Sequence, residues 1–447
     1  MTVLFPALVA VLLGPGAPAT QPVAERVPEP VVAACPEAER PYCEEIARLA
    51  ADPAVRRALA HLDATDADAL RDLILLTEIP APPFMEEVRG RKYAEMLREA
   101  GADSVWVDAV GNVIALRRGR VGGRVVAIAG HLDTVFPEDT DVTVKVRGDT
   151  LFAPGIGDDT RGLVVVLHAL RAMHEAGLRT EADVLFIGTV GEEGLGDLRG
   201  VKHLFGPDGT RIDAFIAVDG GSDSRIVSKA LGSRRYRVTF RGPGGHSWGA
   251  FGTANPMHAL GRAIRLFDEA ADAFTATGAR TSYNVGRIGG GTSVNSVPFE
   301  AWMEVDMRSE SHARLLEIDS IFVASVRKAL DEQNAVRRRG PALEVELDLI
   351  GDRPSGETDP NAPLLLRAMA VTRHFGDEPV LERSSTDSNV PIALGIPAVT
   401  ISRGGIGGGA HSPDEWWINH NGPRAIQRAL LLILSEAGYT GGGTASQ

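Results

Sequence analysis

The sequence predicts an α/β protein: a larger domain with a mainly parallel sheet and helices on both faces, interrupted by a smaller α+β domain. Continuous apolar runs at 182–190 and 212–220 alternate with helical patterns such as 160–177. Strands buried on both faces and separated by helices are typical of parallel sheets. Between 233 and 349, by contrast, strand-like segments alternate apolar and polar residues, which indicates half-exposed antiparallel strands.

The larger domain is expected to comprise residues 45–232 and 350–438, because the same alternation resumes after the insertion. Apolar residues at helical or strand spacing justify its elements in order. Expected helices are 43–76, 85–101, 160–177, 361–374 and 422–437, and expected strands are 104–109, 112–118, 125–130, 182–190, 212–220 and 396–401.

The insertion at 233–349 is expected to place two helices on one antiparallel sheet. Its strands are expected near 233–241, 299–309 and 342–350, and its helices at 256–271 and 311–333. A glycine-rich segment, "RGGIGGGAHS", follows in the larger domain and is expected to be a loop because ordered elements flank it.

Charge argues against nucleic acid and anionic membranes as main partners. The 447 residues include 59 acidic and 46 basic side chains, giving a formal net charge of −13.

Residues 1–20 resemble an export signal, with an apolar stretch and then Ala17-x-Ala19, so a periplasmic or extracellular protein is expected. If the segment is not a signal, the protein is cytoplasmic. No span is expected in the mature chain, since the apolar stretch is too short.

Residues 21–44 are expected to be a linker rich in Pro, Ala and Glu, and 439–447 a tail. Cys35 and Cys43 are the only cysteines. In an oxidising compartment they could form a disulfide, and otherwise they would be free thiols; the sequence favours neither alternative.

Acidic residues and histidines lie where the strands of the larger domain end. Sites in open parallel sheets form beyond the carboxyl ends of the strands, so these side chains are expected to converge. They are His131, Asp133, Asp158, Asp159, Glu192, Glu193, Asp219 and His411.

Such a cluster requires cations. Unpaired carboxylates in one crevice would raise each other's pKa and destabilise the fold. Two imidazoles and three or four carboxylates suit Zn²⁺, with Co²⁺ or Mn²⁺ as alternatives. This is too many ligands for one tetrahedral ion and the right number for two ions. A pair of ions about 3.5–4 Å apart can generate a nucleophile from water.

Glu192 and Glu193 are adjacent, and successive side chains of an extended segment point in opposite directions. One can therefore bind metal while the other faces the attacking water as general base. Asp159 has an alternative role: it could cap the helix that starts near Thr160 and not belong to the metal-binding cluster.

The chain resembles the co-catalytic zinc peptidase and deacylase superfamily, which includes peptidase T, glutamate carboxypeptidase, acetylornithine deacetylase and succinyl-diaminopimelate desuccinylase. The likeness spans about residues 65–437 and, through "SSTDSNVP", is strongest to the peptidase T-like branch. The matching motifs are, in order, "GHLDTVFP", "GIGDDTRG", "GTVGEEGLG", "AVDGG", "GPGGHSWG" and "GGAHSPDEW".

The resemblance implies that Asp158 bridges two metal ions and that the Asp158–Asp159 peptide is cis. Glu192 would be the general base, and Asp133 would orient the ligand His131 from behind it. The implied ligands are His131 and Asp219 for one ion, and Glu193 and His411 for the other.

The resemblance also implies contacts with the substrate. His246 would reach across a homodimer, formed through the inserted lid domain, to stabilise the oxyanion. Arg308 would hold a substrate carboxylate. Asn295 would contact substrate from the lid, and Asp387 and Asn389 from the 384–391 loop.

The expected function is therefore metal-dependent hydrolysis of amide bonds in small peptides, as in an aminopeptidase or tripeptidase. An N-acyl amino acid deacylase or carboxypeptidase of the same superfamily is the alternative. A non-catalytic, metal-stabilised binding protein is more remote, because none of the expected ligands is missing. A phosphoesterase would need more Lys or Arg near the strand ends.

Overall fold

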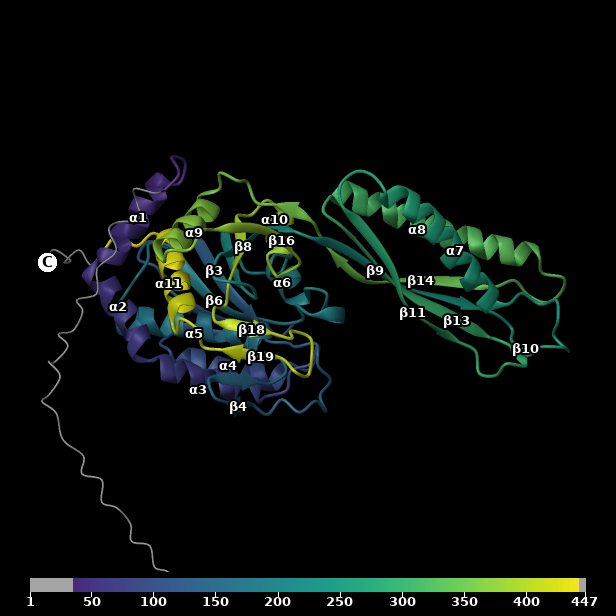
Figure 1. Cartoon of the computed structure of the whole chain (residues 1–447), viewed down its shortest axis with the longest axis horizontal. Helices are drawn as coiled ribbons and strands as arrows, with labels where there is room; N and C mark the ends of the chain where they lie inside the picture. Colours follow the sequence, from purple (N-terminus) through teal and green to yellow (C-terminus); the bar gives the residue numbers. More distant parts are fainter. Residues whose placement is uncertain (1–34, 442–447) are drawn as a thin grey trace, which may run out of the picture.

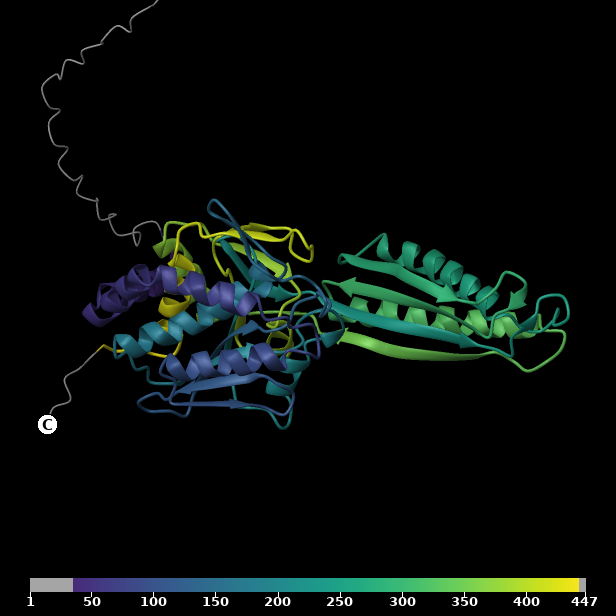
Figure 2. The same cartoon turned by 90° about the horizontal axis from the view of Figure 1, so that it is seen from below.

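The computed structural model describes residues 35–441, and these form two domains (Figure 1). The inserted domain projects from one side of the larger domain, and its long strands run away from that domain (Figure 2). The expected signal at 1–20 lies outside the described residues, as do residues 21–34 of the expected linker and 442–447 of the expected tail.

The larger domain contains a nine-stranded sheet that is parallel at its centre and mostly antiparallel toward its edges. The parallel neighbours β6, β3, β7 and β17 lie in the middle, which confirms the expected α/β class. The strands are β1 (Ser104–Val107), β2 (Val113–Arg117), β3 (Val125–His131), β6 (Asp183–Thr189), β7 (Ala214–Val218), β8 (Arg225–Ala230), β15 (Gly356–Glu357), β16 (Val380–Ser384) and β17 (Ala398–Ile401).

Helices cover both faces of this sheet. Successive residues of β3 alternate between two cores: Val126 and Ile128 pack on one side, Ala127 and Ala129 on the other. This alternation explains why the central strands read as continuous apolar runs. The helices are α1 (Arg40–Ala51), α2 (Pro53–Ala64), α3 (Asp66–Thr77), α4 (Glu87–Glu99), α5 (Gly162–Glu175), α6 (Arg199–Leu204), α9 (Pro363–His374), α10 (Asn389–Ala393) and α11 (Arg424–Glu436).

The helical pattern at 43–76 is divided among α1, α2 and α3. Pro53 starts α2, and the Asp52 side chain caps it by accepting hydrogen bonds from the amides of Ala54 at 2.8 Å and Val55 at 3.2 Å. Since α1 begins at Arg40, the last residues of the expected linker are helical. Cys35 and Cys43 form a disulfide at this end of the chain.

The inserted domain packs α7 (Pro256–Thr275) and α8 (His312–Ala335) on a four-stranded antiparallel sheet of order β11-β13-β9-β14. Every second residue of β13 is buried beneath the helices, as its sequence alternation predicts. The strands are β9 (Gly232–Arg241), β11 (Thr281–Gly290), β13 (Glu300–Ser309) and β14 (Glu344–Arg353), with short β10 (Gly245–His246) and β12 (Ser296–Val297) paired at the end of the domain.

A third sheet holds the glycine-rich segment that was expected to be only a loop. Within it, β18 (Ile406–Gly408) pairs with β19 (Trp416–Ile418), and the sheet is completed by β5 (Thr150–Phe152) and β4 (Lys145–Arg147). The buried Trp417 anchors β19. The turn between β18 and β19 carries His411 and is therefore fixed at both ends.

Among residues 35–441, the structure contains no helix with the length and hydropathy needed to cross a bilayer.

Candidate metal centre and active site

The side chains expected to converge do so at the carboxyl edge of the parallel strands. His131 ends β3, Glu192 and Glu193 follow β6, and Asp219 follows β7. Asp158 joins them from the segment before α5, where its peptide bond with Asp159 is cis, as the resemblance implied.

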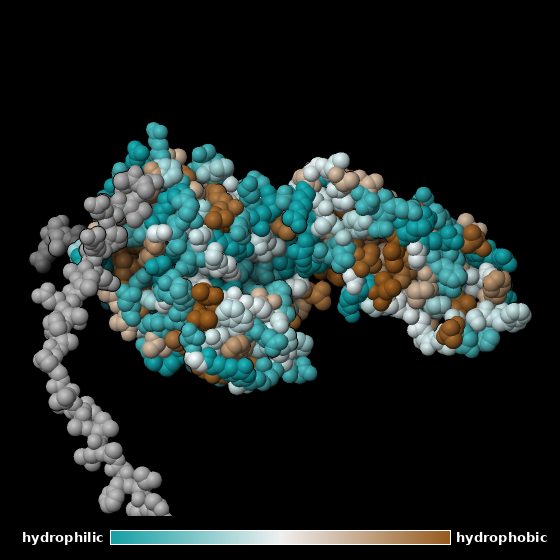
Figure 3. All heavy atoms as spheres, viewed as in Figure 1, coloured by the Kyte–Doolittle hydropathy of each residue, from teal (hydrophilic) through white to brown (hydrophobic). Residues whose placement is uncertain are grey.

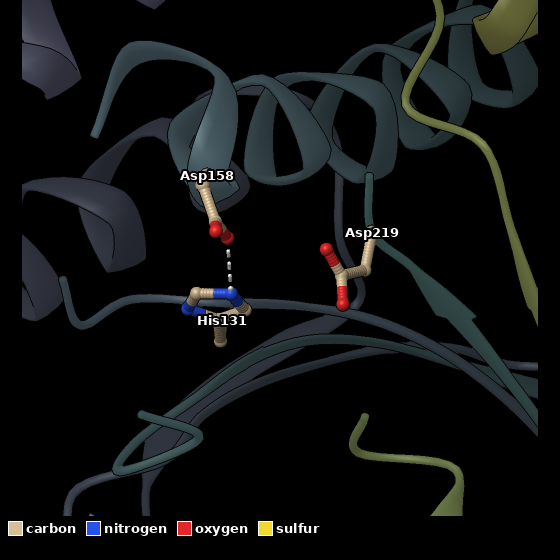
Figure 4. Close-up of side chains that lie close together, drawn as sticks. All are labelled: His131, Asp158 and Asp219. Carbon is tan, nitrogen blue, oxygen red and sulfur yellow. Dashed lines mark hydrogen bonds and ion pairs between the residues drawn. The ribbon is translucent and has the colours of Figure 1, made fainter. Parts of the chain in front are cut away.

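The first ligand group consists of His131, Asp158 and Asp219, whose donor atoms all lie within 4.8 Å of one another (Figure 4). The His131 Nε2 atom lies 3.2 Å from Oδ1 of Asp158. His131 is buried, so its ring is held in place by packing as well as by hydrogen bonds.

The second group consists of Asp158, Glu193 and His411. The His411 Nε2 atom lies 2.8 Å from Oε1 of Glu193 and 3.3 Å from Oδ2 of Asp158. Asp158 thus faces His131 with one carboxylate oxygen and His411 with the other. A carboxylate placed in this way can bridge two ions.

The charges of the cluster suit divalent cations. Burial lowers the pKa of His131, but its hydrogen bond with Asp158 and the nearby carboxylates raise that pKa well above its ordinary value. Hydrogen bonds with Asp158 and Glu193 raise the pKa of His411 to about 10. Protons on both imidazoles would therefore offset the acids in the absence of a cation, and a bound metal would displace those protons. Two imidazoles and three carboxylates in two groups fit two ions.

Asp133 links the end of β3 to the Glu192–Glu193 turn. The His131 Nδ1 atom lies 2.9 Å from the main-chain carbonyl oxygen of Asp133 and 3.8 Å from its carboxylate. That carboxylate instead accepts hydrogen bonds from the amides of Glu192 at 3.0 Å and Glu193 at 2.8 Å. The contact to the imidazole expected from the Asp133 side chain is thus made by its main chain.

Glu192 and Glu193 diverge, as expected for neighbours in an extended segment. Glu193 faces His411, whereas Oε1 of Glu192 accepts a hydrogen bond from Nη1 of Arg353 at 3.2 Å. Burial raises the pKa of Glu192 well above its usual range; Arg353 acts against this effect and Glu193 adds to it. A raised pKa suits a carboxylate that accepts and then returns a proton near neutral pH.

Two further residues support the cluster and were missed in the sequence. Arg353 is buried at the end of β14 and binds Glu192. Buried Glu415 accepts hydrogen bonds from the amides of Gly155 at 2.7 Å and of Gly157 and Asp158 at 2.9 Å each. The quoted motif "GGAHSPDEW" contains Glu415, four residues after His411, so a signal for it was present.

A cavity of about 770 Å³ opens over the cluster. It is lined by Asp158, Glu192, Glu193, Asp219 and His411 and also by Arg308 of β13. The inserted domain therefore supplies part of the cavity wall, and a substrate within it would contact both domains.

Other expected substrate contacts lie elsewhere. Asp387 and Asn389 are buried and do not line the cavity. Asp387 accepts a hydrogen bond from Thr189, and Asn389 donates to the carbonyl oxygens of Leu231 at 2.9 Å and Pro354 at 3.0 Å. These side chains bind the protein itself, while Ser384 and Ser385 of the same loop reach the cavity.

His246 and Asn295 are exposed on the inserted domain and do not line the cavity. His246 pairs with Ser296, next to Asn295, in the β10–β12 ribbon. Figure 1 places this ribbon at the far end of the inserted domain. Within one chain, these two residues are separate from the metal-binding candidates.

Comparison with known proteins gives consistent matches. A protein-family model, described as peptidase family M20/M25/M40, matches residues 127–434. Carboxypeptidase G2 of Pseudomonas sp. (strain RS-16) is 23% identical over 337 residues, which are 72% of this chain and 76% of that protein.

Solved structures share the fold. Aminopeptidase PepT from Bacillus cereus ATCC 10987 superposes with a TM-score of 0.65 at 20% identity, covering 83% of this chain and 98% of that one. The YXEP protein of Bacillus subtilis, described as a dinuclear metal-binding peptidase, has a TM-score of 0.60 at 19% identity, with coverages of 84% and 99%.

Proposed function

Because the chain belongs to the peptidase family M20/M25/M40 and is thus a hydrolase of peptide or related carbon–nitrogen bonds, we propose that it cleaves small peptides in the manner of an aminopeptidase or tripeptidase. The observation that carries this proposal is the position of Asp158 between two ligand groups, with Glu192 beside them in the same cavity.

Two divalent ions, Zn²⁺ in our proposal, would be held in this cluster. His131 and Asp219 would bind one, Glu193 and His411 the other, and Asp158 both. When bound, the ions supply Lewis acidity and lower the pKa of a water molecule.

The chain's own residues perform the proton transfers. Glu192 lines the cavity, where it would accept a proton from the attacking water and return it to the departing amine. Arg353 holds the Glu192 carboxylate in place. Arg308 would bind a substrate carboxylate from the lid side.

We further propose a homodimer through the inserted domain, in which His246 and Asn295 complete the partner's active site. In the described part of one chain, both residues are distant from the cavity. Large apolar side chains are exposed nearby, including Trp248 at 87% and Val294 at 102% of full exposure. Figure 3 shows hydrophobic residues on the surface of the inserted domain, as expected of an interface.

A panel of small amides tests the proposed function. Zinc-loaded protein is expected to release amino acids from di- and tripeptides with free amino termini, as measured by chromatography of the products. Peptides blocked at the amino terminus should be cleaved more slowly. Failure to cleave any member, by protein with two bound zinc ions, would contradict the proposal.

The alternative is a carboxypeptidase or N-acyl amino acid deacylase. It is supported by the name of the relative carboxypeptidase G2 and by Arg308 in the cavity wall, which suits a free carboxylate next to the cleaved bond. Faster cleavage of amino-blocked substrates in the same panel would favour this reading.

We also propose that the protein is exported. The disulfide between Cys35 and Cys43 supports this proposal, because such bonds persist mainly in oxidising compartments.

Replacing Glu415 with glutamine is expected to weaken metal binding about 10- to 100-fold, the usual effect of losing a residue that supports a ligand. In glutamine, an NH₂ group replaces one of the two carboxylate oxygens that accept hydrogen bonds from the backbone amides of Gly155 and Asp158. Competition with a chromophoric chelator measures the affinity. Glu436→Gln is the control and should bind metal normally, because Glu436 is also a buried glutamate but its carboxylate is bound by Arg367. Equal affinities of the two variants would show that Glu415 does not position Asp158.

A further inference from the structure

The cavity above the metal-binding candidates contains an unusual number of arginines for an acidic protein. Five guanidinium groups and five carboxylates line it, so their formal charges cancel in the absence of metal. Two dications would therefore leave an excess of positive charge among the lining residues. The arginines are Arg225, Arg235, Arg308, Arg353 and Arg403, and the carboxylates are Asp158, Glu192, Glu193, Asp219 and Glu382.

Two of the arginines are each matched by one carboxylate. The Nε atom of Arg225 lies 2.9 Å from Oε2 of Glu382, and Arg353 binds Glu192 at 3.2 Å. These two guanidinium groups are neutralised by the protein and do not require a ligand.

Two other arginines, Arg235 and Arg308 of the inserted domain, are only half matched. Arg235 and Arg308 each place Nε 2.8 Å from a different oxygen of Asp306. One carboxylate therefore serves two guanidinium groups, which leaves about one positive charge on this wall for a ligand.

Arg403 lies in the other wall and lines the cavity. Its charge acts through space on Asp158, Asp219 and Glu415, but within the described range 35–441 it has no direct hydrogen bond or ion pair with a side chain. Its head group fits between two glycines beside the ligand candidates. A Cβ added to Gly157 would lie 2.7 Å from Nη2 of Arg403, and one added to Gly220 would lie 3.2 Å from Nη1. Larger residues at these positions would crowd the guanidinium, so the glycines form a cradle for it.

We propose, on the basis of the peptidase function proposed above, that the substrate carries two anionic groups: one bound by Arg308 with Arg235, and a second bound by Arg403. A carboxylate is the chemical class that fits a planar guanidinium best in a peptide-like ligand. The second carboxylate can belong to an acidic side chain on the amine side of the cleaved bond or to a dicarboxylic acyl group on the other side.

Paired substrates test this inference and separate the two sources. The first pair is alanyl-glutamate and alanyl-glutamine, and the second is N-succinyl-alanine and N-acetyl-alanine. In at least one pair, kcat/KM for the doubly anionic member is expected to be about 10- to 100-fold higher, the effect of one charge-assisted hydrogen-bonded contact. The pair that shows the preference identifies the position of the second carboxylate.

Arg403→Met is expected to abolish that preference, so that the ratio of kcat/KM between the two members of the pair falls to about one in protein loaded with two metal ions. Arg237→Met is the matched control: Arg237 lies on β9 and binds Glu304 at 2.7 Å, outside the cavity lining. It should keep the preference.

Inhibition of the unaltered enzyme by free glutamate and glutamine gives a second measurement if Arg403→Met binds less metal. Glutamate is expected to inhibit at least about tenfold more strongly if the preference lies on the amine side, and succinate more strongly than acetate if it lies on the acyl side. Equal cleavage of both members in each pair, or a preference that survives in a metal-loaded Arg403→Met variant, would overturn this inference alone. Cleavage of no member of the peptide panel would instead overturn the proposed function.

Discussion

Replacing Glu192 with glutamine is expected to reduce kcat by about 10²- to 10⁴-fold, the usual contribution of a positioned general base. Glutamine preserves the size of the side chain and one acceptor for Arg353, so the buried guanidinium keeps a partner. It cannot accept a proton from water. Steady-state hydrolysis of the best peptide substrate measures the loss.

Metal binding should survive this substitution. Glu192 belongs to neither of the two groups that contain Asp158, although it forms a third group with His131 and Glu193. Because Arg353 binds its carboxylate, two ions per chain are still expected by elemental mass spectrometry. The matched control is Glu86→Gln, because Glu86 is also buried and bound to an arginine, Arg199, at 2.6 Å. The control should retain activity. Full turnover by the Glu192 variant would contradict its role as general base.

The candidate centre could be predicted from the sequence because its parts lie at strand ends. Apolar runs long enough to be buried identified β3, β6 and β7, and the carboxyl ends of parallel strands meet at one edge. The sequence alone therefore predicts that His131, Glu193 and Asp219 approach one another. His411 and Asp158 were placed by the motifs around them.

Residues that act through tertiary contacts could not be found in this way. Arg353 ends a strand of the inserted domain, 161 positions from the Glu192 that it binds, and no periodicity in the chain relates the two. Strand β11 was missed for a different reason: its segment "TSYNVGRIGG" is polar and rich in glycine, and it becomes a strand by pairing with β13. Strand propensity depends on such context.

The loop at 384–391 shows the limit of transferring roles by resemblance. The resemblance implies that Asp387 and Asn389 of this loop contact the substrate. Instead, Asn389 joins this loop to Leu231 and Pro354, and serines at 384 and 385 face the cavity. Sequence identifies the segment, while the direction of each side chain depends on how the loop packs.

Replacing Asp158 with alanine is expected to weaken the binding of both ions and to abolish detectable hydrolysis. Asp158 is the residue shared by the two ligand groups, and its two oxygens face His131 and His411 separately. Removing it would leave each ion without a ligand and remove an anion from between two dications, whose mutual repulsion would then be poorly screened. Isothermal titration of metal-free protein with Zn²⁺ measures the number of ions bound and their affinities.

His411→Ala provides the comparison that makes this prediction specific. His411 belongs to one of the two groups that share Asp158, and Asp219 belongs to the other. Replacing either residue alone should therefore weaken the binding of one ion and leave the second ion bound tightly. Circular dichroism should show the same secondary structure in all variants, because Glu415 holds the backbone at Asp158 through main-chain amides that the substitution retains. If Asp158→Ala instead binds one ion with unchanged affinity, Asp158 is a ligand of a single site, and a bridged pair of ions is not the arrangement that this cluster supports.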